Sequence, residues 1–435
     1  MLKVTKFGGS SMADAKQYRK VRDIVLADPE RKVVIVSAAG KRDASDHKLT
    51  DLLYLCHAHT KYGVACDPIF DMITSRYTEI RDELGLKVDL ESEFKELKKR
   101  LDSKDMSEDE LASRGEYYSA KLMAAFLDFE FVDAADWIRF KMDGTVDKEV
   151  SYAALKKLGH GKGIVIPGFY GAMPDGRIRT FSRGGSDITG ALAAAALDAD
   201  VYENWTDVSG MLMADPRCVE NPKVIETITY KELRELSYMG ATVMHEDAIF
   251  PVREACIPIN IRNTNSPEDN GTMIVPSTKE IKRVITGIAG KMGFSTISIE
   301  KDMMGSELGF GRKVLEILEK HGVSFEHVPS GVDTMSVIVS TDSIDKIRDE
   351  ITAGIFKLVN ADSVVIEDGL ALIAVVGRGM VKAKGTAARV FSSIYNAGIN
   401  IKMIDQGSSE LNIIIGVDEC DYQATLNAIY NEFDK

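Results

Sequence analysis

A gapless internal repeat in the last third of the chain constrains the fold more than any other feature of the sequence. Six residues of the first copy each have a similar residue 76 positions further on, as Gly398 follows Gly322 (398 − 322 = 76). Both copies predict a strand, a helix, a glycine turn and further strands, so we predict two copies of one small βαββαβ unit. Such a unit leaves an open sheet edge, which favours pairing with its twin or with another chain. The matched positions are Gly309 and Gly385, Val314 and Val390, Gly322 and Gly398, Val323 and Ile399, Gly331 and Gly407, and Met335 and Leu411.

The part of the chain before the repeat alternates strand-like and helical stretches. Residues 32–40 form a largely apolar run of the kind found in a central parallel strand. The run ends at Ser37 and Gly40, where the carboxyl edge of such a strand faces a ligand crevice. Repeated alternation without a long gap predicts an α/β domain with a largely parallel sheet over about residues 1–275.

Composition narrows the class of protein and its partners. A chain of 435 residues is too long for a single core and should contain two or three domains. Its formal net charge of -13 argues against a nucleic acid or an anionic membrane as a partner. The five cysteines form no C-x-x-C pair, which predicts a reducing, cytoplasmic setting without a disulfide framework or a zinc site. No apolar run approaches the roughly 20 residues that a membrane helix needs.

Two glycine pairs stand where a strand passes into a helix. The first, in K-F-G-G-S-S at residues 6–11, lets backbone N–H groups approach an anion, and Lys6 can reach a transferring phosphate. The second, in S-R-G-G-S-D, is flanked by Arg183 and Asp187, which indicates a ligand that carries both charges. We expect Ser186 or Asp187 to cap the helix that follows, and a capped helix without a ligand is the alternative. The P-loop pattern G-x-x-x-x-G-K-[ST] occurs nowhere in the chain.

Other polar positions have a functional and a structural interpretation side by side. Glu116, which we place in the first turn of a helix beginning at Ser113, either binds an ammonium group or only favours the helix dipole. The stretch W-T-D-V at residues 205–208, with Arg217 after it, suits the ribose and phosphates of a nucleotide. The alternative there is an Asp-Pro turn with an exposed arginine. His245 is interpreted as a packed histidine rather than a catalytic base.

Taken together, these stretches resemble the monofunctional aspartate kinases of the amino acid kinase family, over essentially the whole chain. That resemblance implies an N-terminal αβα sandwich followed by two ferredoxin-like ACT domains. It also implies transfer of a phosphoryl group from Mg²⁺-bound ATP to the side-chain carboxylate of L-aspartate. The motifs that carry it are K-F-G-G-S-S (6–11), V-S-A (36–38), S-R-G-E (113–116), S-R-G-G-S-D (182–187), W-T-D-V (205–208) and D-P-R (215–217).

The same resemblance implies roles for individual residues. Glu116 would bind the substrate ammonium, Arg183 the α-carboxylate, and Asp187 would orient substrate and metal-bound phosphate. The remaining implied contacts are Lys6, Gly8, Gly9 and Ser10 with the phosphates, Ser37 and Thr50 along the substrate channel, and Thr206, Asp207 and Arg217 with the nucleotide. Magnesium would be held through the ATP phosphates, without a dedicated protein cage. Thr242 departs from the family pattern, because many relatives have a lysine there.

Regulation and assembly are implied in the same way. The resemblance implies feedback inhibition by an end-product amino acid, lysine or alternatively threonine, and a homodimer or a dimer of dimers formed through the ACT units. The expected domains are residues 1–275, 284–360 and 361–435, with the strand at 284–289 completing the last. The candidate effector contacts are Met303, Ser306, Gly311, Phe325 and Glu326. Two other functions stay open: a kinase of the same fold that acts on another substrate, and a non-catalytic amino-acid sensor.

Overall fold

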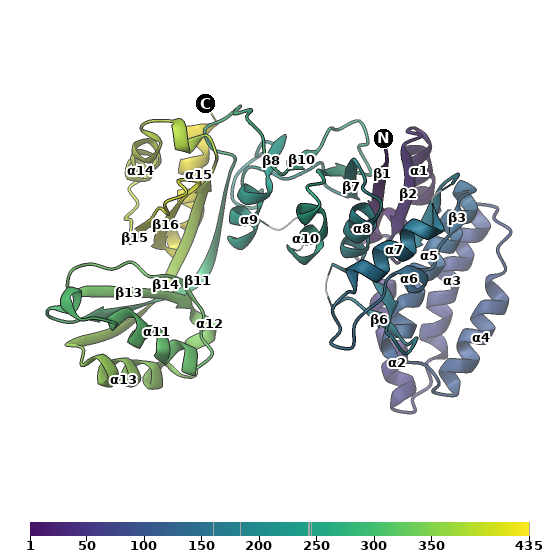
Figure 1. The fold of residues 1–435 in the computed structure, drawn as a ribbon, viewed down its shortest axis with the longest axis horizontal. Helices are drawn as coiled ribbons and strands as arrows, with labels where there is room; N and C mark the ends of the chain where they lie inside the picture. Colours follow the sequence, from purple (N-terminus) through teal and green to yellow (C-terminus); the bar gives the residue numbers. More distant parts are fainter. Residues whose placement is uncertain (160, 183, 242–243, 245, 435) are drawn as a thin grey trace. The chain divides into compact units, whose positions relative to one another are not determined.

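The structure, a computed structural model, describes residues 1–159, 161–182, 184–241, 244 and 246–434. They form two compact units (Figure 1). The first comprises Met1–Met211, Val224–Tyr230 and Val243–Thr278, and the second comprises Leu212–Lys223, Lys231–Thr242 and Lys279–Lys435. Two short segments before residue 275 therefore belong to the second unit. The division at residues 275, 284 and 361 stays a prediction.

The first unit is built on an eight-stranded sheet in the order β3-β4-β2-β1-β7-β9-β10-β8. Every neighbouring pair is parallel except β9 and β10. Strand β2 has the sequence RKVVIV and is almost wholly buried, as expected for a strand covered on both faces. The strands are β1 (Lys3–Phe7), β2 (Arg31–Val36), β3 (Glu130–Phe131), β4 (Ile164–Pro167), β7 (Val201–Thr206), β8 (Thr227–Thr229), β9 (Ile259–Asn263) and β10 (Thr272–Val275).

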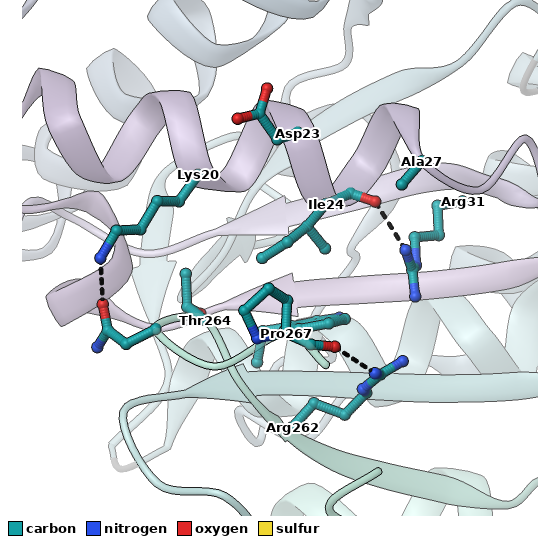
Figure 2. A pocket seen from close by; sticks show the side chains of 10 residues that line it. Lys20, Asp23, Ile24, Ala27, Arg31, Arg262, Thr264 and Pro267 are labelled. Carbon is teal, nitrogen blue, oxygen red and sulfur yellow. Dashed lines mark hydrogen bonds between the residues drawn. The ribbon is translucent and has the colours of Figure 1, made fainter. Parts of the chain in front are cut away.

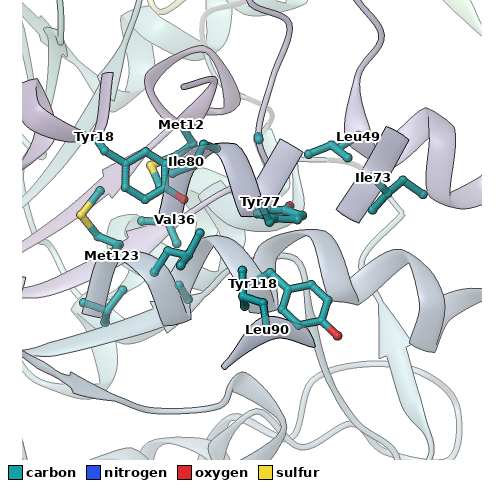
Figure 3. Packing of buried hydrophobic residues seen from close by; sticks show 14 of the residues in the cluster. Met12, Tyr18, Val36, Leu49, Ile73, Tyr77, Ile80, Leu90, Tyr118 and Met123 are labelled. Carbon is teal, nitrogen blue, oxygen red and sulfur yellow. The ribbon is translucent and has the colours of Figure 1, made fainter. Parts of the chain in front are cut away.

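Helices cover both faces of this sheet. On one face, helix α8 packs against β1, β2 and β7 and contacts α7 and α10. On the other face, helices α1 to α5 form a large hydrophobic cluster with residues of β2, such as Val34 and Val36 (Figure 3). The helices are α1 (Ala15–Leu26), α2 (Leu49–Lys61), α3 (Asp67–Glu83), α4 (Leu90–Asp102), α5 (Glu108–Leu127), α6 (Ala134–Trp137), α7 (Lys148–Leu158), α8 (Gly185–Ala196) and α10 (Glu246–Glu254). A short hairpin of β5 (Tyr170–Ala172) and β6 (Ile178–Thr180) stands apart from the sheet.

Two helices begin elsewhere than the sequence predicted. Helix α5 begins at Glu108, where the Ser107 side chain accepts a hydrogen bond from the backbone of Glu110, so Glu116 lies in mid-helix and not in a first turn. Helix α8 begins at Gly185 after Gly184, which has a φ of +58°. No side chain caps this helix, so the expectation that Ser186 or Asp187 would cap it is wrong.

The second unit contains a six-stranded antiparallel sheet in the order β12-β13-β11-β14-β16-β15. Helix α9 (Tyr230–Tyr238) also lies in this unit, apart from its first residue. The other elements are β11 (Gly287–Glu300), α11 (Phe310–Lys320), β12 (Phe325–His327), β13 (Thr334–Ser340), α12 (Thr341–Ile344), α13 (Arg348–Val359), β14 (Ser363–Val376), α14 (Thr386–Asn396), β15 (Met403–Asp405), β16 (Asn412–Asp418) and α15 (Tyr422–Phe433).

The long strands β11 and β14 each serve both copies of the repeat. The first half of β11 pairs with the second half of β14, which also carries β16. The second half of β11 pairs with β13 and with the first half of β14. The predicted fold class is confirmed: a largely parallel α/β sheet is followed by antiparallel sheet of the ACT type. Within the described part of the chain, every helix is too short or too polar to cross a bilayer.

Candidate active site

The glycines after β1 allow two backbone segments to touch. The Gly40 N–H donates to the carbonyl of Gly9 at 2.8 Å, and the Gly8 N–H donates to the carbonyl of Trp205 at 3.1 Å. A Cβ on Gly40 would lie 2.5 Å from the carbonyl carbon of Gly9, closer than real side chains come. Glycine at position 40 is therefore required for this approach, and it joins the loop after β1 to the loop after β2.

A buried polar cluster lies beside these loops. Lys6 and Asn204 are paired residues of the neighbouring strands β1 and β7, so their side chains leave the same face of the sheet. That face is the one covered by α8, whose first turn carries Asp187. One oxygen of the Asp187 carboxylate, Oδ1, accepts from Lys6 Nζ at 2.6 Å and from Asn204 Nδ2 at 3.0 Å. The predicted site residues Lys6 and Asp187 are thus brought together, and a Cβ placed on Gly8 would lie 3.6 Å from Lys6 Nζ.

Asn204 is a polar contact of Asp187 that the sequence reasoning missed. The period-two pattern of β7 contains the only signal for it. Tyr202 and Asn204 leave one face of the strand, while Glu203 and Trp205 leave the other. Tyr202 also touches α8, because its hydroxyl donates to the Asp187 carbonyl. Because Asn204 lies beside Lys6 in the register of β1 and β7, the strand pairing alone made its side-chain amide a candidate contact of the site.

A cavity of about 480 Å³ opens at the edge of the sheet beside the two joined loops. Its volume lies within the range of small-molecule sites. Six residues with a predicted role line it: Gly9, Ser10, Ser37, Thr50, Glu116 and Asp207. The other lining residues are Ala38, Ala39, Gly40, Lys41, Asp43 and Lys48.

Glu116 is the one deeply buried carboxylate in the lining of this cavity. Its residue exposure is 5 %, and its Oε2 atom has no hydrogen-bond partner among the described residues. Burial raises the pKa of Glu116 from its ordinary 4.5 to about 8, and a hydrogen bond from the Ala38 backbone offsets only part of this. An ionised carboxylate buried without a cation is costly, so the neutral form of Glu116 is favoured unless a positive charge lies beside it.

Two other predicted nucleotide contacts, Thr206 and Arg217, do not line this cavity. Thr206 ends β7, and its hydroxyl donates to the carboxylate of its neighbour Asp207. Arg217 belongs to the second unit, is exposed, and pairs with Asp215 at 2.6 Å. The predictions for Arg183, Thr242 and His245 lie outside the described residues.

The candidate effector residues cluster around β12 and the loop before α11. Met303 and Phe325 are exposed apolar side chains, and Ser306 donates to the Met303 carbonyl. Gly311 lies in the first turn of α11. Glu326 is already engaged, because its carboxylate accepts a hydrogen bond from the hydroxyl of Tyr238 in α9.

A second hollow, of about 420 Å³, lies on the α1 face of the sheet and therefore opposite Asp187 (Figure 2). Its cations are already bonded: Lys20 to Asn265, Arg31 to Glu203, and Arg262 to backbone carbonyls. We assign this hollow no function. Among the described residues no cluster of three or more His, Cys, Asp or Glu side chains is arranged to hold a metal ion.

We expect the raised pKa of Glu116 to appear in the stability of the protein. The folded protein should bind more protons than the unfolded chain between pH 4.5 and about 8, so this group should lower stability as the pH rises through that window. Glu116→Gln abolishes the titration. The free energy of unfolding of the variant, measured with urea at pH 5, 7 and 9, should therefore rise relative to the native protein as the pH increases. A difference that stays constant across the three pH values would contradict the assignment.

Comparison with known proteins places these features in a family. The sequence pattern of the amino acid kinase family matches residues 1–263, and that of the ACT domain matches residues 373–433. Aspartokinase 3 of Bacillus subtilis is 40% identical over 447 aligned residues, which cover 99% of this chain and 98% of the relative.

Solved structures agree over the full length. The aspartate kinase of Clostridium acetobutylicum, described as an allosteric enzyme, is 50% identical with a TM-score of 0.90 and 99% coverage of both chains. Aspartokinase III of E. coli, solved with aspartate and ADP and also with lysine and aspartate, is 25% and 26% identical with TM-scores of 0.72 and 0.74, and both comparisons cover 100% of both chains. This chain therefore belongs to the amino acid kinase family and, within it, to the aspartokinases, which are phosphotransferases.

Proposed function

We propose that this protein transfers the γ-phosphoryl group of ATP to the side-chain carboxylate of L-aspartate, giving ADP and 4-phospho-L-aspartate. In metabolism this reaction begins the synthesis of lysine, threonine and methionine. The observation that carries the proposal is Glu116, a buried carboxylate without a hydrogen-bond partner at Oε2, in a cavity bounded by the glycine loop after β1. The aspartate bound in a related structure supports the choice of substrate.

Glu116 binds the substrate ammonium in this proposal. An ammonium ion beside it favours the charged carboxylate, lowers its pKa, and relieves the cost of burying it. Arg183 holds the α-carboxylate as a planar, bidentate partner. Ser37 and Thr50 line the cavity and contact the rest of the substrate.

The phosphoryl donor binds at the side of the cavity formed by the glycine loop after β1. The chain offers Lys6 and the N–H groups of Gly9 and Ser10 to the phosphate oxygens, a donor set that suits an anion, whereas the N–H of Gly8 already donates to the Trp205 carbonyl. Thr206 and Asp207, at the end of β7, hold the nucleotide. Mg²⁺, bound through the phosphates, supplies neutralisation of their charge.

The acceptor needs little chemical activation. The side-chain carboxylate of aspartate is already ionised near neutral pH, so no strong base is required. Catalysis then depends on position and charge, with Lys6 neutralising the phosphoryl oxygens and Asp187 orienting Lys6. Asn204 keeps the Asp187 carboxylate in place.

The reaction itself can be tested with hydroxylamine, which traps acyl phosphates. With Mg²⁺ and ATP, the protein should form a trappable product from L-aspartate and none from L-glutamate, because the shorter side chain places its carboxylate at the phosphate. Glu116→Gln should lower kcat/KM for aspartate by about 10²-fold or more, as expected when one partner of a buried charge pair is lost. A product with glutamate but not aspartate would support a different kinase of this fold. No product with either would contradict the proposal.

For regulation, we propose feedback inhibition by lysine through the ACT units, with threonine as the alternative effector. The lysine-bound relative supports the choice of lysine. Helix α9 offers a route for the signal, since it follows β8 of the catalytic sheet directly in the chain and lies in the second unit. One face of α9, at positions spaced by three, contacts both copies of the repeat.

Three side chains of α9 make these contacts. Glu232 is fully buried and accepts from the Thr286 hydroxyl at 2.6 Å and from Arg378 Nη1 at 2.8 Å. Glu235 accepts a hydrogen bond from the side-chain amide of Asn412, the first residue of β16, at 2.6 Å. Tyr238 donates to Glu326 on β12. If the effector ammonium binds Glu326, it competes with Tyr238 and alters the last turn of α9.

We also propose that the ACT units pair two copies of the chain. Strand β12 is an edge strand, and its Phe325 is half exposed. An open edge with an exposed aromatic side chain favours pairing with a second chain. A homodimer, or a dimer of dimers, follows.

Tyr238→Phe tests this route. The variant lacks the hydroxyl that competes for Glu326, so lysine should inhibit at a concentration about threefold to tenfold lower, the range expected for one hydrogen bond. Maximal inhibition should be smaller, because α9 no longer responds to the effector strand. Activity without lysine should be unchanged, and Tyr395→Phe, at an exposed tyrosine of α14, is the control. An unaltered inhibition curve for Tyr238→Phe would contradict the route.

A further inference from the structure

The loop between β2 and α2 supplies much of the cavity wall, but few of its side chains are apolar. Eight of the twelve lining residues come from residues 37–50. Between Gly40 and Leu49 the sequence is K-R-D-A-S-D-H-K, which contains no large hydrophobic side chain. Hydrophobic burial therefore cannot fix the position of this loop, and polar contacts must do so.

One carboxylate gathers those polar contacts. Asp46 is the one residue of 41–48 that is not exposed. Its carboxylate accepts from the backbone and side chain of Arg42, at 2.9 and 3.0 Å, within the loop itself. Burial alone would raise the pKa of Asp46, but hydrogen bonds from the Arg42 and His47 backbones and the charge of Arg76 outweigh burial and hold it well below its usual range.

Arg76 of α3 connects this carboxylate to the glycine loops. Its side chain is 6 % exposed, and its Nη2 donates to both oxygens of Asp46, at 2.6 and 2.8 Å. Its Nη1 donates to the carbonyl of Gly40 at 3.1 Å and lies 3.5 Å from the carbonyl of Ala13. The N–H of Gly40 in turn donates to the carbonyl of Gly9. One guanidinium therefore contacts both the loop 40–48 and Ala13, which follows the glycine loop after β1.

We propose that Arg76 is a positioning residue for the amino-acid substrate, acting through Asp46 and Gly40 to hold the loop 40–48 against the cavity. Arg76 is not among the residues that line the cavity. The planar, five-donor guanidinium can serve two carbonyls and a carboxylate at once, which a lysine ammonium in the same place cannot do. The choice of L-aspartate as substrate rests on the proposed function. The contacts by which Arg76 and Asp46 hold the loop 40–48, here called the clamp, do not depend on that choice.

The clamp predicts a selective loss of substrate binding. Asp46→Asn keeps the size of the side chain and removes the charge that pairs with Arg76. Its dissociation constant for L-aspartate, measured by calorimetry, should rise tenfold or more, while that for ADP should stay within about twofold. In steady-state kinetics KM for aspartate should rise more than kcat falls. Arg76→Lys keeps the positive charge, so its dissociation constant for L-aspartate should lie between those of Asp46→Asn and the native protein.

Glu91→Gln is the matched control. It removes a guanidinium–carboxylate contact made by Arg81, which lies on the same helix as Arg76 and does not line the cavity. This variant should bind aspartate and ADP like the native protein. A general loss of stability would affect both ligands and both variants, and that outcome would overturn a specific role for Arg76.

Hydrogen exchange separates the clamp from the proposed function. Amides of residues 41–48 should exchange faster in Asp46→Asn than in the native protein or in Glu91→Gln, with or without substrate. Unchanged exchange and unchanged aspartate affinity would overturn the inference. A native protein that binds no aspartate would instead overturn the proposed function, and the exchange measurement would still decide whether Arg76 holds the loop.

Discussion

The ion pair between Lys6 and Asp187 is the interaction on which the rest of the site depends. It joins β1 to the first turn of α8 across a buried sheet face, and Asn204 of β7 fixes the same carboxylate oxygen. Because both side chains are mostly shielded from water, removing either would leave an uncompensated charge. The parallel register of β1 and β7 is what makes the three groups meet, so the geometry of the sheet and the chemistry of the site are set together.

The cavity beside this pair combines a rigid side with a polar one. Parallel strands, and glycines that allow the backbone of Gly9 to touch Gly40, form the rigid side. The loop 40–48 forms the other, and Arg76 and Asp46 hold it without hydrophobic help. Glu116 lines the same cavity with an unpaired oxygen, and burial makes its charged form costly, a cost that a bound ammonium would lower. This division suits an enzyme that must grip a small zwitterion and align one carboxylate with a phosphate.

The sequence predicts the fold class well because glycine turns, buried strand runs and a gapless repeat are local or periodic signals. Features that depend on tertiary contact escaped it. Asp187 looked like a helix cap but is drawn to Lys6 instead. The short strands β5, β6 and β10 gave no clear period. The helix that carries Glu116 was predicted to begin at Ser113, although Ser107 and Glu110 mark its true start five residues earlier, at Glu108.

Site residues divide in the same way. Those in compact motifs, such as Gly9 and Ser10, meet at one cavity with Glu116 from a distant helix. Asn204 and Arg76 belong to no motif, and only register and three-dimensional packing show them beside the site. Long-range polar contacts of this kind leave little trace in a single sequence.

Proton release on substrate binding tests most directly whether Glu116 receives the ammonium of the substrate. With a pKa of about 8, Glu116 is mostly protonated at pH 7 and must lose its proton when an ammonium binds. Calorimetric titration of L-aspartate at pH 7, in two buffers of different ionisation enthalpy, should show release of close to one proton per site. Aspartate binding without proton release, or the same release in Glu116→Gln, would contradict the account.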